Sequence, residues 1–437
     1  MVILVIGTAP TGSSASPAGG SRGPVRATTT GQPPASVQSP GIHGRSSVTR
    51  IPAPEVAATV TTVDGDQYAG GENAIYAPDR QHVFVAYKRF LRDAFDPGGD
   101  VVEAELRVAI SDDGGATWDV QILTSDAAEE GDVIQQSVAI DGDGNHAVWI
   151  AYMVQNDRGS FLRFARTEDD GDHWTLGGVA RFAGEYKAMQ VLGPESVLIA
   201  SNHQAPGDPE LRLYGTTDGG LTWTRSLVDK GADWYVGFDR GFDGRLWISF
   251  YDGGDTDLLA STAKSAAGPW TTRVIGGTGD DEFFTGIFSS LDLSLGTIYV
   301  ACEDFQPSLG RSVVRLYRST DGGAHWTRTI VDSAFAIGWN TTVHTLRSNG
   351  GANSDVYLSY WHEYVKPPVY HGHVRVAHSV DGGETWSVWT IPESRSVLPD
   401  IDSAAPALDT QFVSYSVWNR NTGHRFLRVA RIDLSQT

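Results

Sequence analysis

The chain has 437 residues, and its 53 acidic and 33 basic side chains give a formal net charge of -20. Such a charge repels phosphate backbones and anionic lipid surfaces at long range, which excludes nucleic acid as an expected partner. The 50 glycines and 13 tryptophans are typical of many short strands joined by tight turns, so the composition predicts an all-β fold.

The first fifty residues differ in composition from the rest of the chain. Residues 1–9 (MVILVIGTA) resemble the apolar part of a signal peptide, although no basic residue precedes them. Residues 10–50 are dominated by Ser, Gly, Pro, Thr and Ala, which bury too little apolar surface to offset the entropy of ordering. We therefore expect a disordered leader over residues 1–50, a single folded domain over 51–437, and a secreted or extracytoplasmic location.

One octapeptide pattern, S/T-x-D-x-G-x-x-W, recurs after a strand-like stretch at residues 55–63 (EVAATVTTV). Five intact copies end at Trp118, Trp174, Trp223, Trp326 and Trp386, and a degraded copy, AKSAAGPW, ends at Trp270. The tryptophans recur roughly every 50 residues, a period that suits one four-stranded blade of a β-propeller.

Each octapeptide lies between two strand-like stretches, such as ELRVAI before the first copy and WDVQIL after it, and is therefore predicted to be a hairpin turn. The aspartate of the turn can accept hydrogen bonds from backbone N–H groups, and the glycine permits a positive φ. The tryptophan is expected to pack back between neighbouring sheets. We assign structural roles, not catalytic or metal-binding ones, to the five aspartates: Asp113, Asp169, Asp218, Asp321 and Asp381.

Seven strand-like stretches with alternating apolar residues recur along the chain, and the first six each precede an octapeptide: HVFVAYKRF, AVWIAYMVQ, SVLIASNHQ, RLWISFYDG, TIYVACEDF, DVYLSYWHE and QFVSYSVWN. The seventh is followed by RFLRVARIDL and then by no fourth strand, so the last repeat is one strand short. Residues 55–63 are predicted to supply that strand. The result is a seven-bladed propeller of four-stranded blades, closed by an N-terminal strand that removes exposed sheet edges.

Cys302 is the single cysteine, so no intrachain disulfide can form, and its apolar neighbours (IYVAC) predict a buried side chain without a redox role. No apolar run approaches the ~18 residues that a membrane-spanning helix needs, which predicts no membrane insertion. His371 and His373 have no identifiable third ligand, so we expect no metal or cofactor beyond a structural calcium ion. The protein is expected to be a monomer.

The octapeptides, the strands before them and their spacing resemble the Asp-box (BNR-repeat) propellers of the sialidase-like superfamily over residues 55–433. The resemblance implies a secreted glycan-active protein, in first place an exo-glycosidase that removes a terminal acidic sugar. A uronate-polysaccharide lyase and a non-catalytic carbohydrate- or protein-binding propeller remain as alternatives. Sialidases have six blades, so the resemblance also leaves a six-bladed ring as the alternative to the seven counted.

The resemblance extends to some sialidase site motifs. Arg50-Ile51-Pro52 matches the Arg-Ile-Pro segment of that family, although Thr49 stands where an aromatic residue is usual. The stretch AYKRFLRDAFDPGGD resembles the loop that carries the family's acid/base aspartate, and places Asp93 or Asp96 in that role. The family's nucleophile is a tyrosine with a glutamate partner. We take as further catalytic candidates three residues at loop positions after the tryptophans: Glu185, Tyr235 and Glu282.

The loops opposite the octapeptide turns are expected to share one face, where ligands bind. Loops between the second and third strands carry Arg89, Arg92, Arg158 and Arg420 in neighbouring blades, and guanidinium groups suit bidentate capture of a substrate carboxylate. Trp339 and His362 are further substrate-binding candidates, and His203, His362 and Tyr364 would suit a lyase. The loops into the inner strands add acidic and aromatic residues: Asp132, Asp233, Asp281, Asp400, Asp402, Tyr186, Trp234 and Phe283. The plainer interpretation is that these charges are solvated or hold a structural cation.

Overall fold

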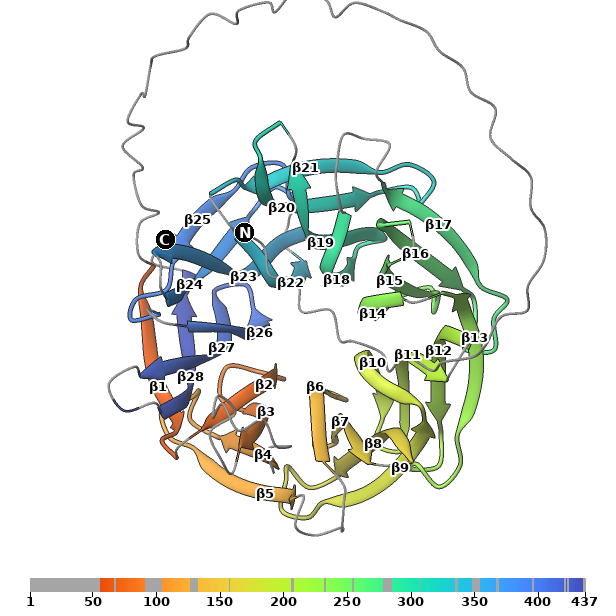
Figure 1. Cartoon of the computed structure of the whole chain (residues 1–437), viewed down its shortest axis with the longest axis vertical. Helices are drawn as coiled ribbons and strands as arrows, with labels where there is room; N and C mark the ends of the chain where they lie inside the picture. Colours follow the sequence, from red (N-terminus) through yellow and green to blue (C-terminus); the bar gives the residue numbers. More distant parts are fainter. Residues whose placement is uncertain are drawn as a thin grey trace, which may run out of the picture. The chain divides into compact units, whose positions relative to one another are not determined.

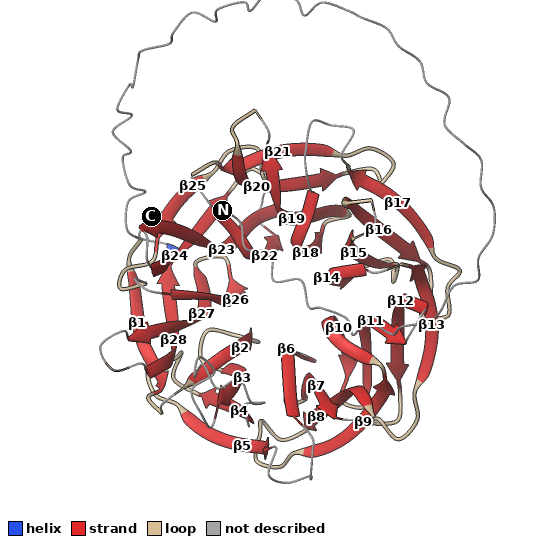
Figure 2. Cartoon of the chain, viewed as in Figure 1, coloured by secondary structure: helices blue, strands red, loops and turns tan. Residues whose placement is uncertain are grey.

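The computed structural model describes residues 56–434, except for residues 67, 91–103, 126–132, 157, 206–207, 232, 254, 278–284, 307, 335–336, 348–353, 367–368, 395–396, 420–421 and 423. The described residues form 28 strands, arranged as blades around a common centre (Figures 1 and 2). The leader predicted over residues 1–50 lies outside them. Within the described part of the chain, no helix has the length and apolar character needed to cross a bilayer.

Each of the first four blades is an antiparallel sheet of four consecutive strands. Blade one consists of β2 (Ala69–Tyr76), β3 (Val83–Phe90), β4 (Ala104–Ser111) and β5 (Asp119–Ser125), and blade two of β6 (Val133–Gly142), β7 (Val148–Asn156), β8 (Gly159–Thr167) and β9 (Thr175–Arg181). Blade three consists of β10 (Ala183–Gly193), β11 (Ser196–Ala205), β12 (Asp208–Thr216) and β13 (Thr224–Lys230), and blade four of β14 (Asp233–Arg240), β15 (Leu246–Asp252), β16 (Asp257–Ala263) and β17 (Thr271–Gly276).

The remaining blades complete a ring of seven. Blades five and six consist of β18 (Thr285–Ser294), β19 (Thr297–Gln306), β20 (Arg311–Ser319) and β21 (Thr327–Asp332), and of β22 (Ile337–Arg347), β23 (Ser354–Lys366), β24 (Val369–Ser379) and β25 (Ser387–Thr390). Blade seven consists of β26 (Val397–Ala407), β27 (Thr410–Asn419), β28 (His424–Asp433) and the N-terminal strand β1 (Ala58–Asp64). The prediction of seven four-stranded blades is confirmed, and the six-bladed alternative is wrong.

The N-terminal strand closes the ring. β1 pairs antiparallel with β28, from Ala58 opposite Ile432 to Asp64 opposite Leu427. It is therefore the outer strand of blade seven, as the missing fourth strand of the last repeat predicted. Because the first and last strands belong to one sheet, the ring cannot open at this seam without breaking their pairing.

Apolar side chains fill the spaces between neighbouring blades. Alternate residues of each strand face each neighbour, so the second strand of a blade contributes to two interfaces. In blade one, Phe84 belongs to a buried cluster with Ile150 of blade two, whereas Val85 belongs to a cluster with Phe412 of blade seven. Cys302 lies in such an interface and is fully buried, and its Sγ lies 3.3 Å from Asp304 Oδ1.

The octapeptide turns are held by their aspartate and by the serine or threonine before it. In the first turn, Asp113 Oδ1 accepts hydrogen bonds from the backbone N–H groups of Ala116 (2.9 Å) and Thr117 (2.8 Å). Ser111 Oγ accepts the N–H of Gly115 at 2.8 Å and donates to Asp113 at the same distance. Hydrogen bonds from the Thr117 side chain and from these backbone groups lower the pKa of Asp113 to about 2. The same pattern recurs at four aspartates: Asp169, Asp218, Asp321 and Asp381.

Several turn tryptophans tie a blade to the one before it. Their indole N–H groups donate to side chains on the outer strand of the preceding blade: Trp118 to Thr61 (3.2 Å), Trp174 to Gln121 (3.0 Å) and Trp270 to Ser226 (3.3 Å). The indoles of Trp223 and Trp386 instead donate to glycine carbonyls of their own turns. Trp270 keeps the cross-blade contact although its octapeptide has lost the aspartate, so this contact does not require the aspartate.

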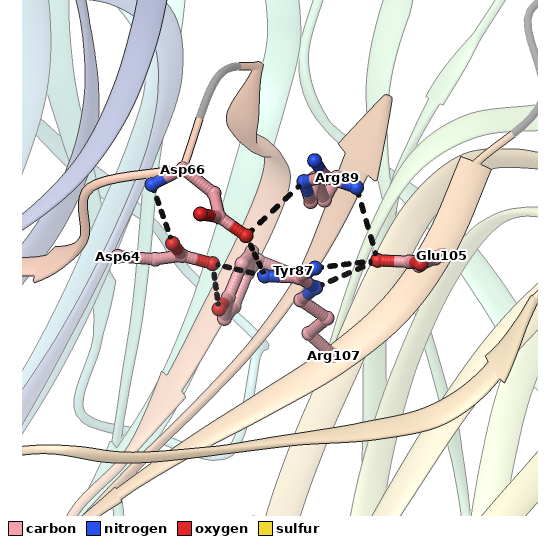
Figure 3. Close-up of polar contacts among 6 residues, drawn as sticks. All are labelled: Asp64, Asp66, Tyr87, Arg89, Glu105 and Arg107. Atoms are coloured by element: carbon pink, nitrogen blue, oxygen red, sulfur yellow. Dashed lines mark hydrogen bonds and ion pairs between the residues drawn. The ribbon is translucent and has the colours of Figure 1, made fainter. Parts of the chain in front are cut away.

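A buried ionic cluster attaches the closing strand to blade one. The carboxylate of Asp64, at the end of β1, accepts hydrogen bonds from Tyr87 Oη (2.6 Å) and Arg107 Nη1 (2.8 Å) (Figure 3). Arg107 also pairs with Asp66 at 3.0 Å and with Glu105 at 2.7 Å. The side chains of Asp64 and Arg107 are only 6% and 8% exposed. Removal of either charge would therefore leave its partner buried without compensation, which is costly.

Candidate functional site

The innermost strands of the blades surround a cavity of about 750 Å³. Its lining comes from all seven of them: β2, β6, β10, β14, β18, β22 and β26. Figure 1 shows these strands nearest the centre of the ring. A cavity of this size, built from every blade, is large enough for a ligand of a few rings and is the candidate functional site.

Irregular pairing near the start of each inner strand turns selected side chains into the cavity. In β2, β14, β18 and β22 the register with the second strand shifts, and one non-glycine residue within the shift has a positive φ. These residues are Glu72 (φ 45°), Tyr235 (55°), Phe288 (54°) and Asn340 (47°). All four line the cavity. Bulges of this kind redirect side chains, and positive φ at non-glycine residues is a strain that clusters at functional sites.

One wall of the cavity is aromatic. The ring of Tyr235 lies 4.8 Å from that of Tyr186 and 4.4 Å from that of Phe288, measured between centroids. The hydroxyl groups of the two tyrosines are hydrogen-bonded, and burial raises the pKa of both. The planes of neighbouring rings are inclined by 63° and 50°, so three contiguous rings from blades three, four and five form an aromatic surface, here called the platform, against which the apolar face of a ligand can pack.

The cavity also carries carboxylates with cations beside them. Burial raises the pKa of Glu72, and the charge of Asp400 adds to this, whereas Lys88, Lys187 and Arg425 oppose it. Asp400 lies 3.5 Å from Arg425 Nη1. The charge of Glu72 also affects Tyr186, so the carboxylates and the aromatic platform belong to one site. A carboxyl group with a raised pKa beside an ion-paired carboxylate is an arrangement that can perform acid/base chemistry.

Lys187 is a buried amine in the same wall. Its Nζ donates a hydrogen bond to the carbonyl oxygen of Gly184 at 2.6 Å. Burial lowers the pKa of Lys187 to about 7, despite the opposing influence of Glu72 and Glu185. Glu185 in turn accepts hydrogen bonds from Asn202 (3.5 Å) and Gln204. Near neutral pH Lys187 can therefore act as either a proton donor or an acceptor.

Deeper in the cavity, aspartates join neighbouring blades through their inner strands. Each accepts a backbone N–H from the next blade around the ring: Asp141 from Val191 (2.7 Å), Asp239 from Leu293 (2.7 Å), Asp292 from Thr345 (2.6 Å) and Asp402 from Ile75 (2.9 Å). Burial raises the pKa of Asp141 and of Asp402 to about 7. Burial also raises the pKa of Asp239 and of Asp292, whose side chains are hydrogen-bonded to each other. These residues are structural links that also make the cavity floor acidic.

The structure brings only some of the predicted site residues to the cavity. Glu185 and Tyr235 line the cavity, whereas Arg89, Arg158 and His362 are not among its lining residues. Arg89 Nε lies 3.6 Å from Asp66 and its Nη1 3.4 Å from Glu105 (Figure 3), so two carboxylates hold it in the seam between blades seven and one.

Arg158 lies in the predicted loop, whereas His362, which was expected in a loop, lies within strand β23. Arg158 is exposed in the β7–β8 turn, where its carbonyl oxygen accepts a hydrogen bond from Arg181 Nε at 3.0 Å. His362 is half-buried on β23, opposite His373. The cavity therefore assembles its charges from strands, not from the predicted arginine loops.

Other predicted site residues lie outside the described residues. These are Arg50, Asp93, Asp96, Arg92, Glu282 and Arg420; for Trp339 the backbone on β22 is described but the side chain is not. Their assignment as catalytic or substrate-binding stays a prediction. Among the described residues, no group of three or more His, Cys, Asp or Glu side chains is arranged to hold a metal ion.

The sequence analysis missed Glu72, the cations around it and one ring of the aromatic platform. Glu72, Lys88, Lys187, Phe288 and Arg425 lie on strands, and single charges on strands usually point to solvent. The one available signal was the pair of glycines before Glu72 in AGGENAIY, because glycine inside a strand often marks a bulge.

No protein-family model and no curated protein matches the sequence. Solved structures of similar fold include a Hadza microbial sialidase, with a TM-score of 0.51 and 12% identity over 84% of this chain and 66% of that chain. They also include an ulvan lyase of polysaccharide lyase family PL25, with a TM-score of 0.50 and 12% identity over 88% of this chain and 95% of that chain. At this identity the similarity shows the β-propeller fold alone.

Proposed function

We propose that the protein is a glycan-active enzyme, a glycoside hydrolase that binds one sugar ring in the central cavity. The observation that carries the proposal is the combination of the Tyr186–Tyr235–Phe288 platform with Glu72 and Asp400 in one cavity. Aromatic rings bind the apolar face of a sugar, and two carboxyl groups supply the acid and the base or nucleophile of glycosidic cleavage. The sialidase and the ulvan lyase of similar fold differ in reaction type, so the proposal rests on the cavity.

Glu72 is the proposed general acid. Burial raises the pKa of its carboxyl group, which favours the protonated form that can donate to the leaving-group oxygen. Asp400 is the proposed second carboxylate, because it lines the same cavity and forms an ion pair with Arg425 at 3.5 Å. In this role it attacks the sugar directly or activates a water molecule.

The finer proposal that the terminal sugar is acidic rests on Lys88, Lys187 and Arg425. The charges of all three act on Glu72, and Lys187 lines the cavity, so their combined field can attract a sugar carboxylate. The acids of the floor, such as Asp141 and Asp402, oppose this attraction. A substrate panel therefore needs acidic and neutral sugars: a fluorogenic sialoside, an aryl glucuronide, and aryl glycosides of neutral hexoses and pentoses.

The test of the hydrolase proposal is the leaving-group dependence of Glu72→Gln. On the aryl glycoside that the wild-type chain hydrolyses, this variant should lose about 100-fold or more in kcat, the usual contribution of a general acid. On the 2,4-dinitrophenyl glycoside of the same sugar it should recover most of the loss, because that leaving group needs no proton. Glu384→Gln, which alters an exposed carboxylate of an octapeptide turn away from the cavity lining, is the control and should keep wild-type kcat.

Two results would overturn the hydrolase proposal. In the first, the wild-type chain hydrolyses no member of the panel. In the second, Glu72→Gln loses the same factor with both leaving groups, which would exclude proton donation by Glu72.

A uronate-polysaccharide lyase is the second candidate, and Lys187 is the observation that favours it. With its pKa lowered to about 7, its amine is partly neutral at physiological pH and can remove the proton beside a uronate carboxylate. Elimination creates an unsaturated product that absorbs in the ultraviolet. Such absorbance with the wild-type chain, lost in Lys187→Met, would replace the hydrolase proposal by this one.

A further inference from the structure

A chain of aromatic rings continues from the cavity platform to the surface. Tyr251 of β15 lies 6.3 Å from the ring of Tyr235 and 6.2 Å from the ring of Trp234, which is inclined to it by 34°. Tyr251 is buried, whereas Trp234 is 38% exposed and is not among the residues that line the cavity. The four rings of Phe288, Tyr235, Tyr251 and Trp234 are therefore contiguous, with Tyr186 beside Tyr235, and they lead from the cavity to the exposed Trp234.

The register shift in β14 explains how two successive aromatic residues join one path. In a regular strand Trp234 and Tyr235 would point to opposite faces of the sheet. The pairing with β15 shifts between Trp234 and Gly237, and Tyr235 has φ 55°, so both side chains approach the common neighbour Tyr251. Backbone strain is retained here at the point where the path enters the cavity.

The surroundings of this outer segment are acidic. Burial raises the pKa of Tyr251, and the charges of Asp252 and Asp257 raise it further. Glu303 acts on Tyr235 in the same direction. By contrast, the cations of the site lie on the Glu72 side of the cavity. An anionic group is therefore disfavoured along the outer rings, whereas a neutral sugar can stack there and direct its hydroxyl groups to the carboxylates.

We propose that the exposed ring of Trp234, supported by the buried ring of Tyr251, forms a second sugar subsite, which holds a neutral sugar residue adjoining the one bound in the cavity. The substrate is then an oligosaccharide or the end of a polysaccharide, and the exposed face of Trp234 is the outer boundary of the binding path. This inference rests on the proposed function for its biological meaning. Its test measures binding and does not require turnover.

The experiment titrates full-length Glu72→Gln protein, with and without Trp234→Ala, by isothermal titration calorimetry. The ligands are three neutral oligosaccharides, lactose, cellotriose and arabinotriose, then 3′-sialyllactose, in which an acidic terminal sugar adjoins neutral ones, and the anionic trisaccharide trigalacturonate. At least one ligand with a neutral second sugar should bind, more tightly than trigalacturonate. Trp234→Ala should weaken that binding about tenfold, the loss of one aromatic stacking contact.

The matched control is Phe242→Ala in the same background. Phe242 is 94% exposed in the β14–β15 turn, at the other end of the same two strands, so its removal also deletes an exposed aromatic ring of blade four. It should leave oligosaccharide binding unchanged.

The proposal is overturned if Trp234→Ala binds the ligands with a neutral second sugar as tightly as its parent, if trigalacturonate is preferred, or if none of the ligands with a neutral second sugar binds. Failure of the hydrolase proposal gives a different result. In that case the aryl glycosides stay intact, while the effect of Trp234→Ala on binding is still measurable and would indicate a carbohydrate-binding propeller.

Discussion

Replacing Arg107 by methionine leaves the carboxylate of Asp64 buried beside Tyr87 without its cationic partner. Arg89 remains within 3.6 Å of Asp66 and 3.4 Å of Glu105, so these two acids keep a positive charge nearby. The loss therefore falls on Asp64, which is 6% exposed and retains only neutral donors. An uncompensated buried charge costs about 3–5 kcal/mol, and the remaining bond from Tyr87 places the expected loss at about 3 kcal/mol.

The chain provides a matched control in blade three. Arg212 follows Glu210 in the same Glu-Leu-Arg sequence as Glu105 and Arg107, and pairs with Glu210 at 2.6 Å. Glu210 and Arg212 occupy the same positions in blade three as Glu105 and Arg107 in blade one. Among the described residues, however, Arg212 forms no ion pair with a counterpart of Asp64. Arg212→Met removes the intrastrand pair alone, so the excess loss in Arg107→Met measures the contact with the closing strand.

The assay is urea denaturation of both variants, combined with hydrogen exchange of the β1 amides. Arg107→Met should unfold at lower urea than Arg212→Met, and only Arg107→Met should accelerate exchange in β1, because the seam opens first. Adding Asp64→Asn to Arg107→Met should restore much of the stability, since the unpaired charge is gone. Equal losses in the two single variants, with unchanged exchange in β1, would refute the role of this cluster in closing the ring.

Three further predictions concern pH and packing. The folded-state pKa of Asp141 and of Asp402, about 7, exceeds the ordinary value of 3.8. Their contribution to stability is therefore complete below about pH 4 and is lost as the pH rises through 7. The thermal midpoint should fall from pH 5 to pH 8, and it should fall less in Asp141→Asn. The turn aspartates behave oppositely, because the pKa of Asp113 is lowered to about 2. Their contribution to stability is present above pH 4 and is lost as the pH falls through 2. The melting temperature below pH 4 should therefore depend less on pH in Asp113→Ala. Gly372→Ala should destabilise the fold by about 1–3 kcal/mol in chemical denaturation, because the added Cβ would lie 1.6 Å from Nε1 of Trp361. This Nε1 donates a hydrogen bond to the Val397 carbonyl oxygen, which joins blades six and seven. Unchanged stability would show that Trp361 can move without loss.

The fold could be predicted because its signals are local and repeated. The turn around Asp113 uses hydrogen bonds within a few residues, and the same octapeptide appears in four other blades. The closing strand was predictable by counting, since a repeat that lacks its outer strand needs one from elsewhere in the chain. β1 begins at Ala58 and not at residue 55, a difference that composition cannot resolve.

The site was less predictable because it depends on backbone irregularity. Glu185 and Tyr235 were found because they follow the tryptophans at regular offsets, whereas Glu72 precedes the first octapeptide and was overlooked. Whether Arg89 faces a ligand or a carboxylate depends on Asp66 and Glu105, and no pattern in the sequence states which partner a charged strand residue takes.

The differences among equivalent positions favour an enzyme over a repetitive binding protein. All seven inner strands have a register shift in their pairing with the second strand, and the residues within these shifts that line the cavity include Glu72, Tyr186, Tyr235, Phe288, Asn340 and Asp400. A propeller that binds the same ligand in every blade would repeat one residue type at this position. Here carboxylates occur in blades one and seven and aromatic rings in blades three to five, so the pseudo-symmetric ring presents a single asymmetric site. Catalysis needs this asymmetry, because the acid, the second carboxylate and the sugar platform must differ and converge on one bond.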